Sequence, residues 1–264
     1  MIKLIVADCD GTILDDNKKI DPQLKTVITE LEKKNITFTL ASGRNIFLMS
    51  EIIDDLNIQC PYIINNGASI YQGNKSIKNY LLPKESIHEI LSILENGNFP
   101  FLAYSETDLY MYSSHSLLEG FKVRLKNKLN FVEFDSSMKL NNVELFKITI
   151  ATDDVNEIKE VKDKIERLYP SLNFKRSEGT LFSITNGEAT KGNAIKTIAD
   201  MMNVKKEEIM IFGDNYNDIT MFDVAGVGVA MGNSDEEIKA LATHNALDNN
   251  HNGVSEFLEK YFSL

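Results

Sequence analysis

The sequence predicts an α/β protein: a doubly wound, mostly parallel sheet built from both ends of the chain and interrupted by an inserted α+β module. Two observations carry this prediction. Strand-like and helix-like segments alternate near both ends, which favours parallel strands joined by right-handed helical crossovers. Between them, short strand-like segments come in adjacent pairs, as in an antiparallel sheet. We therefore expect residues 1–80 and 188–264 to form one discontinuous domain and residues 81–187 to form another.

The first part of the chain opens with an apolar run. Residues 2–7 contain only one polar residue, Lys3, which is typical of a strand covered on both faces. Asp21 and Pro22 suit the N-cap and the first position of a helix. The apolar face of that helix is supplied by Val27, Ile28 and Leu31. The elements expected next are a strand at 36–41, a helix at 45–56 and a strand at 62–64.

The remaining elements follow from the same patterns. In the middle of the chain we expect helices at 86–95, 121–128 and 155–168, and strands at 101–104, 109–112, 145–151, 174–176 and 181–185. After residue 187 the alternation returns, with helices at 190–202, 217–225 and 235–242 and strands at 208–212 and 227–230. The return of alternation indicates that the two ends of the chain share one sheet.

Composition excludes several classes of protein. The chain has 264 residues, of which 43% are hydrophobic, so it can bury a full core. No window approaches the roughly 18 apolar residues of a membrane helix, and the first apolar run ends too early for a signal peptide. Two cysteines and four histidines lack the number and spacing of disulfide frameworks or zinc sites. We expect a cytoplasmic protein with no membrane partner.

Charge narrows the choice of partner. The net charge is −11, and nucleic-acid binders carry a strong basic face that this chain lacks. The densest basic stretch, residues 122–128, fits a solvated helix face. We expect no nucleic-acid partner, and a monomer or weak homo-oligomer, since no interface pattern stands out. An acidic chain repels phosphorylated metabolites at long range, so a site for one needs local positive charge.

Four polar clusters follow predicted strands or open a predicted helix. In open α/β sheets, ligands collect beyond the carboxyl ends of the strands. One aspartate after a strand is often an ordinary turn residue, but four clusters at equivalent ends predict a shared site. The clusters are Asp8-Cys9-Asp10-Gly11-Thr12, Ser42-Gly43-Arg44, Thr190-Lys191-Gly192 and Gly213-Asp214 with Asn217-Asp218.

The residue types in these clusters suggest a metal and an anion. Asp8 and Asp10 point to one face if the strand continues, and Asp214 adds a third carboxylate. Converging carboxylates need a cation or a proton, and oxygen ligands without imidazole or thiolate suit Mg²⁺. The alternative is a set of N-capping or turn aspartates. Lys191 starts a helix, where the dipole already favours anions, and therefore suits a phosphate.

Other residues of the clusters would support that site. Gly11 permits a sharp turn that aims backbone N–H groups at a ligand, and the hydroxyls of Thr12 and Ser42 add donors. Asp218 is placed to hold Lys191. Asn217 is placed to bond either a phosphate or Asp218.

Several motifs, in this order, match those of one enzyme superfamily: D-x-D-G-T at 8–12, S-G-R at 42–44, N-G-A at 66–68, T-K-G at 190–192, G-D-x-x-N-D-x-x-M at 213–221 and G-V-A-M-G-N at 228–233. The chain resembles the haloacid dehalogenase-like hydrolases, in their Cof-like phosphatase branch. The motifs cover both core segments, whereas 81–187 matches by position and pattern only, as the cap domain. Cys9 stands where a larger aliphatic is usual, and Ser183 and Asn252 stand where an acid is common.

The resemblance implies a Rossmann-like core and a Mg²⁺-dependent phosphatase that acts on small phosphorylated metabolites, sugar phosphates foremost, through an aspartyl-phosphate. It implies Asp8 as nucleophile and Asp10 as acid and base, with the metal held by Asp8, Asp214 and the Asp10 carbonyl. The phosphate ligands it implies are Cys9 through its backbone N–H, Thr12, Ser42, Gly43, Lys191 and Asn217. Asp218 and Arg44 would support them. Candidate substrate contacts in the cap are Tyr104, Glu106, His115 and Arg176.

Two alternatives remain open. A sugar phosphomutase would use the same motifs and return the phosphate to another hydroxyl. A regulatory protein that binds a phosphorylated metabolite with little turnover would need the anion site. It would not need a nucleophile together with an acid.

Overall fold

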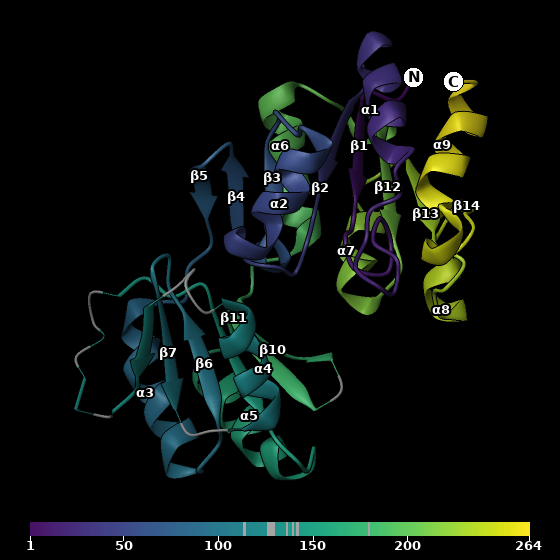
Figure 1. The fold of residues 1–264 in the computed structure, drawn as a ribbon. Coiled ribbons are helices and arrows are strands. Elements are labelled where there is room, and N and C mark those ends of the chain that lie inside the picture. Colours follow the sequence, from purple (N-terminus) through teal and green to yellow (C-terminus); the bar gives the residue numbers. More distant parts are fainter. Residues whose placement is uncertain (113–114, 126–129, 136, 139, 141–142, 179) are drawn as a thin grey trace. The chain divides into compact units, whose positions relative to one another are not determined.

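Figure 1 shows the fold of the chain in a computed structural model, which describes residues 1–264 except 113–114, 126–129, 136, 139, 141–142 and 179. The chain divides into two compact units. The first unit combines Met1–Lys78 with Thr190–Leu264, and the second is Asn79–Ala189.

The first unit is organised around a five-stranded parallel sheet in the order β14-β13-β12-β1-β2. Its strands are β1 (Leu4–Ala7), β2 (Thr37–Leu40), β12 (Ile209–Gly213), β13 (Val227–Ala230) and β14 (His244–Asn245). Strand β1 pairs on one side with β12 and on the other with β2, so Ala7 lies opposite both Phe212 and Leu40. The parallel strands β12, β1 and β2 therefore end at the same edge of the sheet.

Helices cover both faces of this sheet, which explains the continuous apolar run of β1. Ile5 and Ala7 face one apolar cluster, which also holds residues of α1, α2 and α9. Leu4 and Val6 face the other cluster, with residues of α6 and α7. The helices of this unit are α1 (Leu24–Lys33), α2 (Ile46–Leu56), α6 (Lys191–Met202), α7 (Ile219–Phe222), α8 (Glu236–Lys239) and α9 (Gly253–Phe262). This doubly wound α/β arrangement confirms the predicted fold class.

Some elements of the first unit differ from the prediction. Helix α1 begins at Leu24, because the Asp21 carboxylate accepts the N–H of Gln23 in a turn that precedes the helix. Strand β3 (Tyr62–Ile64) belongs to a separate three-stranded sheet with β4 (Ser69–Gln72) and β5 (Lys75–Asn79). It touches the main sheet through a parallel bridge between Ile63 and Ala41. Strands β4, β5 and β14 and helix α9 were not predicted from the sequence.

The second unit has a six-stranded sheet in the order β10-β11-β9-β6-β7-β8, antiparallel except for the parallel pair β7 and β8. Its strands are β6 (Phe101–Tyr104), β7 (Asp108–Tyr112), β8 (Asn130–Glu133), β9 (Lys147–Ala151), β10 (Leu172–Glu178) and β11 (Leu181–Asn186). Its helices are α3 (Lys84–Asn96), α4 (Ser116–Leu125) and α5 (Glu157–Leu168). The last part of the predicted helix at 121–128, residues 126–128, lies outside the described residues.

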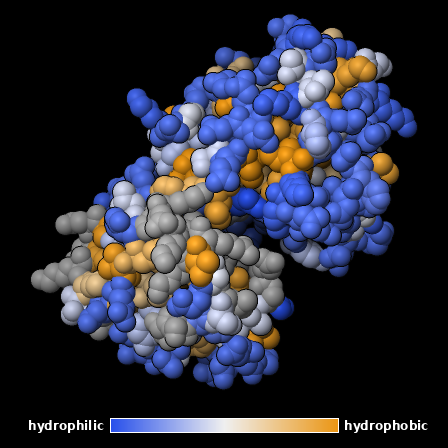
Figure 2. Space-filling view, viewed as in Figure 1, coloured by the Kyte–Doolittle hydropathy of each residue, from blue (hydrophilic) through white to orange (hydrophobic). Residues whose placement is uncertain are grey.

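One face of this second sheet is apolar. Ile148 and Ile150 of β9 share that face with Phe101 of β6, and helices α3 and α5 pack against it. Figure 2 shows that hydrophilic side chains cover much of the visible surface of the molecule. Within the described ranges, no helix is both long enough and apolar enough to cross a membrane.

Candidate active site

Lys191 is the central charge of the candidate site. It is the first residue of α6, where the Thr190 hydroxyl accepts the N–H of Asn193 and caps the helix. The Lys191 side chain is fully buried, and its Nζ donates to Oδ1 of Asp8 and to Oδ1 of Asp218, both at 2.6 Å. Burial alone would lower the pKa of Lys191, but the two carboxylates outweigh it and raise the pKa above its usual value. The lysine therefore stays charged.

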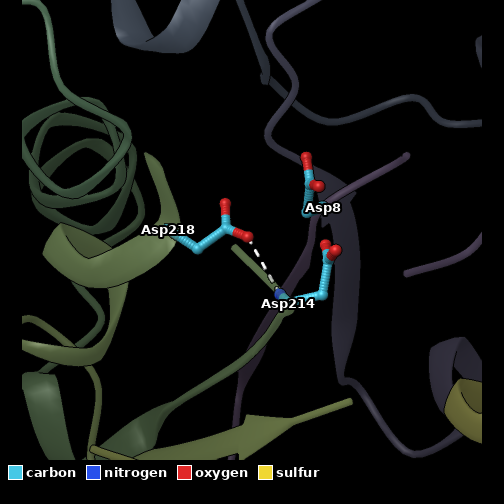
Figure 3. A group of neighbouring side chains, drawn as sticks. All are labelled: Asp8, Asp214 and Asp218. Atoms are coloured by element: carbon cyan, nitrogen blue, oxygen red, sulfur yellow. Dashed lines mark hydrogen bonds between the residues drawn. The ribbon is translucent and has the colours of Figure 1, made fainter. Parts of the chain in front are cut away.

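Asp218 holds Lys191 and the loop that follows β12 at the same time. Its Oδ1 accepts from Lys191, while its Oδ2 accepts the backbone N–H groups of Asp214 and Asn215 at 3.0 and 3.1 Å. Figure 3 shows the bond from Asp218 to the Asp214 nitrogen. A fully buried carboxylate needs such partners, because an unpaired buried charge is costly. Asp218 thus fixes where Asp214 and Lys191 lie.

Asp8, Asp214 and Asp218 form a cluster that we call the carboxylate cluster. One oxygen from each lies within 4.8 Å of the others, as Figure 3 illustrates. Burial, together with the neighbouring aspartates, raises the pKa of Asp8 well above its usual value despite Lys191. Burial and the charge of Asp218 raise the pKa of Asp214 to about 6. Together, the three carboxylates carry more negative charge than Lys191 neutralises.

The loop after β1 is shaped to fit against this cluster. The carbonyl of Cys9 accepts the N–H groups of the next turn, from Thr12 onward, so the chain folds back directly after the strand. Gly11 has φ +80°, and a Cβ there would lie 2.3 Å from Oδ2 of Asp214. Only glycine fits both constraints. The Thr12 hydroxyl donates to Asp214 Oδ1 at 3.0 Å, so this predicted anion ligand contacts a carboxylate in the structure.

The donor set of the carboxylate cluster fits a hard divalent cation. It consists only of oxygen atoms, which Mg²⁺ prefers, and its surplus negative charge would be relieved by a cation. Both oxygens of Asp218 already accept strong hydrogen bonds. Asp8 and Asp214 therefore retain the greater capacity to bind a metal. The carboxylate of Asp10 is not a member of this cluster.

Asp10 is paired elsewhere. Nε and Nη2 of Arg44 each donate to its carboxylate at 2.7 Å, and Nζ of Lys18 donates at 2.9 Å. Burial would raise the pKa of Asp10, but these hydrogen bonds and charges outweigh it and lower the pKa to about 2. The structure thus brings Arg44 to Asp10 and separates the Asp10 carboxylate from the carboxylate cluster.

The remaining predicted residues line the ends of β2 and β3. The buried Ser42 hydroxyl accepts the backbone N–H of Arg44 at 3.1 Å. A Cβ on Gly43 would lie 2.9 Å from Oδ1 of Asn66. That same Oδ1 accepts a hydrogen bond from Nδ2 of Asn217 at 3.1 Å. The Asn217 amide therefore donates to Asn66 in this bond, whereas the sequence predicted a phosphate or Asp218 as its partner. The contact joins the loop after β3 to the loop after β12.

The Cys9 side chain points into the apolar core of the first unit. Its side chain is fully buried in the apolar cluster of α1, α2 and α9, and its Sγ is 3.8 Å from Sδ of Met49. Burial, followed by the charge of Asp8, raises the pKa of its thiol. A neutral, buried thiol is a packing group and a poor nucleophile.

Three residues that contact the candidate site were given no role in the prediction from sequence. Lys18, with φ +62° in a tight turn, contacts Asp10. Asn66, also left-handed, contacts Asn217. Nδ2 of Asn233 donates to the Gly11 carbonyl at 2.9 Å. The N-G-A and G-V-A-M-G-N motifs pointed to Asn66 and Asn233, whereas no motif pointed to Lys18.

The raised pKa values predict how stability depends on pH when no divalent metal is present. The folded chain binds protons at Asp214 and Asp8 more tightly than the unfolded chain does, so stability falls as pH rises from about 4 to 6. In EDTA, acidification from pH 7 to 5 should increase the free energy of unfolding by at least about 1 kcal/mol, which is the share of Asp214 alone. Urea unfolding at each pH measures it.

Asp214→Asn is the matched control for this prediction. It should be more stable than the parent at pH 7 in EDTA and should show a flatter pH dependence, because one buried charge is gone. Equal pH slopes for the two proteins would contradict the assignment. Asp10 has the opposite effect. Its pKa is lowered in the folded chain, so its stabilising contribution is lost as pH falls below about 4.

Comparison with known proteins agrees with this geometry. The family model of haloacid dehalogenase-like hydrolases matches residues 5–258. A Bacillus subtilis protein named 5-amino-6-(5-phospho-D-ribitylamino)uracil phosphatase is 26% identical over 285 residues, with 99% of each chain covered. The crystal structure of TM0651 from Thermotoga maritima is 30% identical, with a TM-score of 0.85 and 98% and 97% of the two chains covered.

A second solved structure is of a protein named for its activity. It is a sugar phosphatase of subclass IIB of the haloacid dehalogenase superfamily, 25% identical to this chain, with a TM-score of 0.82 and 99% of each chain covered. These proteins match this chain over nearly its whole length, including the second unit.

Proposed function

The chain belongs to the haloacid dehalogenase-like hydrolases and is a phosphatase, and from that premise we propose that it hydrolyses small phosphorylated metabolites, sugar phosphates foremost, with Mg²⁺ and through an aspartyl-phosphate. One observation carries the proposal. Asp8 lies at the carboxyl end of β1, next to a buried lysine and a second carboxylate that could bind a metal. A nucleophile, a fixed cation and a metal position are what phosphoryl transfer requires.

In the first step, an oxygen of Asp8 attacks phosphorus and the bond from phosphorus to the leaving oxygen breaks. Asp10 gives its proton to that oxygen, which leaves as an alcohol. In the second step, water attacks the phosphorus of the aspartyl-phosphate, Asp10 takes a proton from the water, and the bond to Asp8 breaks. Inorganic phosphate leaves, and both carboxylates return to their starting state.

Lys191 and Asp218 prepare the site for this chemistry. Because Lys191 is buried and held from two sides, its charge needs no reorganisation as negative charge builds on the phosphoryl oxygens. Asp8 and Asp214, with the Asp10 carbonyl, would hold Mg²⁺. When bound, the ion supplies positive charge that offsets repulsion between Asp8 and the phosphate.

Asp10 must be released before it can act. Arg44 and Lys18 hold its carboxylate ionised in the structure. A protonated Asp10 therefore requires that these contacts loosen when substrate binds. An anionic phosphate is a competing partner for both cations, which gives a physical reason for the release.

The second unit and the polar loops would supply the remaining functions. We propose that the second unit is a cap that selects the leaving group, and that Cys9 through its backbone N–H, Thr12, Ser42, Gly43 and Asn217 bind the phosphate. The sugar phosphatase at 25% identity supports a sugar phosphate as the substrate class. A phosphomutase, the second candidate, differs in outcome: it would move phosphate between hydroxyls without net release.

A metabolite screen tests the proposal. The purified protein should release phosphate from para-nitrophenyl phosphate and from a panel of sugar phosphates with Mg²⁺, and EDTA should abolish the release. Transfer of phosphate between sugar positions without release would favour the mutase. Tight binding of a sugar phosphate with negligible turnover would favour a regulatory protein.

Cys9→Val should retain magnesium-dependent turnover within about threefold, because the side chain packs in the core and its thiol stays neutral. The measurement is kcat/KM with para-nitrophenyl phosphate. A loss as large as that of Asp8→Asn would show that the thiol takes part in the chemistry.

A further inference from the structure

Lys18 belongs to a short turn of the first unit whose backbone is fixed by hydrogen bonds. The turn runs from Asp15 to Lys19, and we call it the Lys18 turn. The N–H of Asp15 donates to the Lys19 carbonyl, and the N–H of Lys18 donates to the Asp15 carbonyl, both at 2.9 Å. Lys18 itself has φ +62°, a conformation that few residues other than glycine adopt. The backbone thus fixes the point from which the Lys18 side chain extends.

Two asparagines near the end of the chain anchor the Lys18 turn. The N–H of Asp16 donates to Oδ1 of Asn250, and Nδ2 of Asn250 donates back to Oδ2 of Asp16, both at 3.2 Å. Nδ2 of Asn249 donates to the Leu14 carbonyl at 3.0 Å and to Oδ1 of Asp16 at 3.2 Å. Such supporting bonds hold a surface turn in one place, as a functional side chain on that turn requires.

Lys18 is the second cation at the Asp10 carboxylate. Arg44 already donates to both oxygens of that carboxylate at 2.7 Å, and a bidentate arginine pairs with one carboxylate charge. Nζ of Lys18, 2.9 Å from Oδ1, therefore brings positive charge in excess of what Asp10 neutralises. The Lys18 side chain is 58% exposed, and an exposed ion pair contributes little to stability. Stability alone does not explain why this cation is anchored here.

The role proposed for Asp10 places this excess charge beside the leaving group. A side chain that donates a proton lies within roughly 3 Å of the atom that receives it. Because Nζ of Lys18 is 2.9 Å from the Asp10 carboxylate, it lies at most about 6 Å from the leaving oxygen. An anionic substituent close to that oxygen would span this distance. The phosphoryl group has other proposed partners, Lys191 and Mg²⁺, at a carboxylate cluster that does not include the Asp10 carboxylate.

We propose that Lys18, together with Arg44, binds a carboxylate of the leaving group close to the ester oxygen, so that the preferred substrates are phosphorylated hydroxy acids. The proposal rests on the phosphatase function proposed above. Asp10 shows in the structure that a carboxylate fits between the two cations. The carboxylate of the substrate would take its place and free Asp10 to act. A neutral leaving group would offer the two cations no such partner.

Lys18 is a specificity-determining residue in this assignment, and Asp16, Asn249 and Asn250 are positioning residues. All of them belong to the first unit, as do Asp10 and the carboxylate cluster. The assignment therefore concerns one compact unit of the chain.

Matched substrate pairs test the assignment. 2-Phosphoglycerate and glycerol 2-phosphate differ only by a carboxylate in place of a hydroxymethyl group, and so do 3-phosphoglycerate and glycerol 1-phosphate. The parent protein should favour the carboxylate member of at least one pair by about tenfold or more in kcat/KM. Lys18→Met should reduce that ratio by at least about fivefold, whereas Lys18→Arg should keep most of it because the charge remains.

Two further variants sharpen the test. Lys19→Met removes the neighbouring exposed lysine of the same turn and should leave the ratio intact. Asp16→Ala removes the anchor and should lower the ratio, and combining it with Lys18→Met should lower the ratio no further, since both changes act through Lys18. Equal losses of kcat/KM for both members of each pair in Lys18→Met would mean that Lys18 does not contact the leaving group, and would overturn the proposal.

A binding measurement separates this proposal from the proposed function. In Asp8→Asn with Mg²⁺, titration calorimetry should show tighter binding of the carboxylate member of at least one pair, and added Lys18→Met should remove the difference. If the parent hydrolyses no phosphate ester, the phosphatase function fails, and the calorimetric difference still decides whether Lys18 binds the carboxylate. Turnover of phosphate esters without preference in either pair overturns only the Lys18 assignment.

Discussion

Asp8→Asn should reduce turnover by at least about 10⁴-fold while the protein remains folded, because an amide cannot attack phosphorus as a carboxylate does. The change keeps the shape of the side chain, and Asp218 still pairs with Lys191. The loss should therefore appear in kcat with every substrate, including para-nitrophenyl phosphate. Steady-state kinetics at saturating Mg²⁺ measures it, and circular dichroism checks the fold.

The matched control is Asp223→Asn, which removes an exposed aspartate just beyond α7 and should leave kcat unchanged. Trapping offers an independent readout. The parent quenched during turnover should carry acid-stable label from a ³²P-labelled substrate at Asp8, and Asp8→Asn should carry none. Activity of Asp8→Asn within tenfold of the parent would remove Asp8 as the nucleophile.

Lys191→Met should lower the free energy of unfolding by about 3 to 5 kcal/mol and should abolish turnover. Methionine has a similar length, so the main change is the loss of the positive charge. Asp8 and Asp218 would be left buried without their shared cation. Urea unfolding at pH 7 in EDTA gives the value, and the loss should shrink as acidification protonates Asp8.

Two control variants test whether the loss of stability in Lys191→Met comes from the unpaired carboxylates. Lys196→Met, on the exposed side of the same helix, should change stability by less than about 0.5 kcal/mol. The double variant Lys191→Met with Asp218→Asn should recover part of the lost stability, because it removes one of the uncompensated charges. A loss below about 1 kcal/mol for Lys191→Met would mean that the carboxylates become neutral at little cost.

Much of the first unit could be predicted because its signals are local and repeated. The apolar run before Asp8 indicates a strand covered on both faces, and β1 indeed faces two apolar clusters. Four polar clusters at strand ends predict a shared site, and the structure brings Asp8, Lys191, Asp214 and Asp218 together. The pattern works because parallel strands end at one edge.

The missed elements lack such signals. Strand β5 alternates exposed polar residues around a single Ile77, so it buries too little to be recognised. The link between β4 and β5, Gly73-Asn74, is a two-residue hairpin signal that could have revealed both strands. Strand β8 pairs in parallel with β7 through a connection that includes α4, which no local pattern reveals.

The side-chain partners of Asp10 could not be predicted for a different reason. An extended chain would place Asp8 and Asp10 on one face, but β1 ends at Ala7 and the chain turns on the Cys9 carbonyl. Asp10 then meets Arg44 from the loop after β2 and Lys18 from its own turn. Such contacts depend on how loops meet in space.

The pairing of β1 with β12 has a consequence for biosynthesis. Leu4 of β1 pairs with Ile209 of β12, so the ribosome makes β1 long before one of its two neighbouring strands. Until then β1 offers an open, apolar edge, which is a template for association with other chains. The interrupting segment has a core of its own and is able to fold in the meantime. Growth of the chain past residue 213 is thus the event that ends exposure of the nascent sheet.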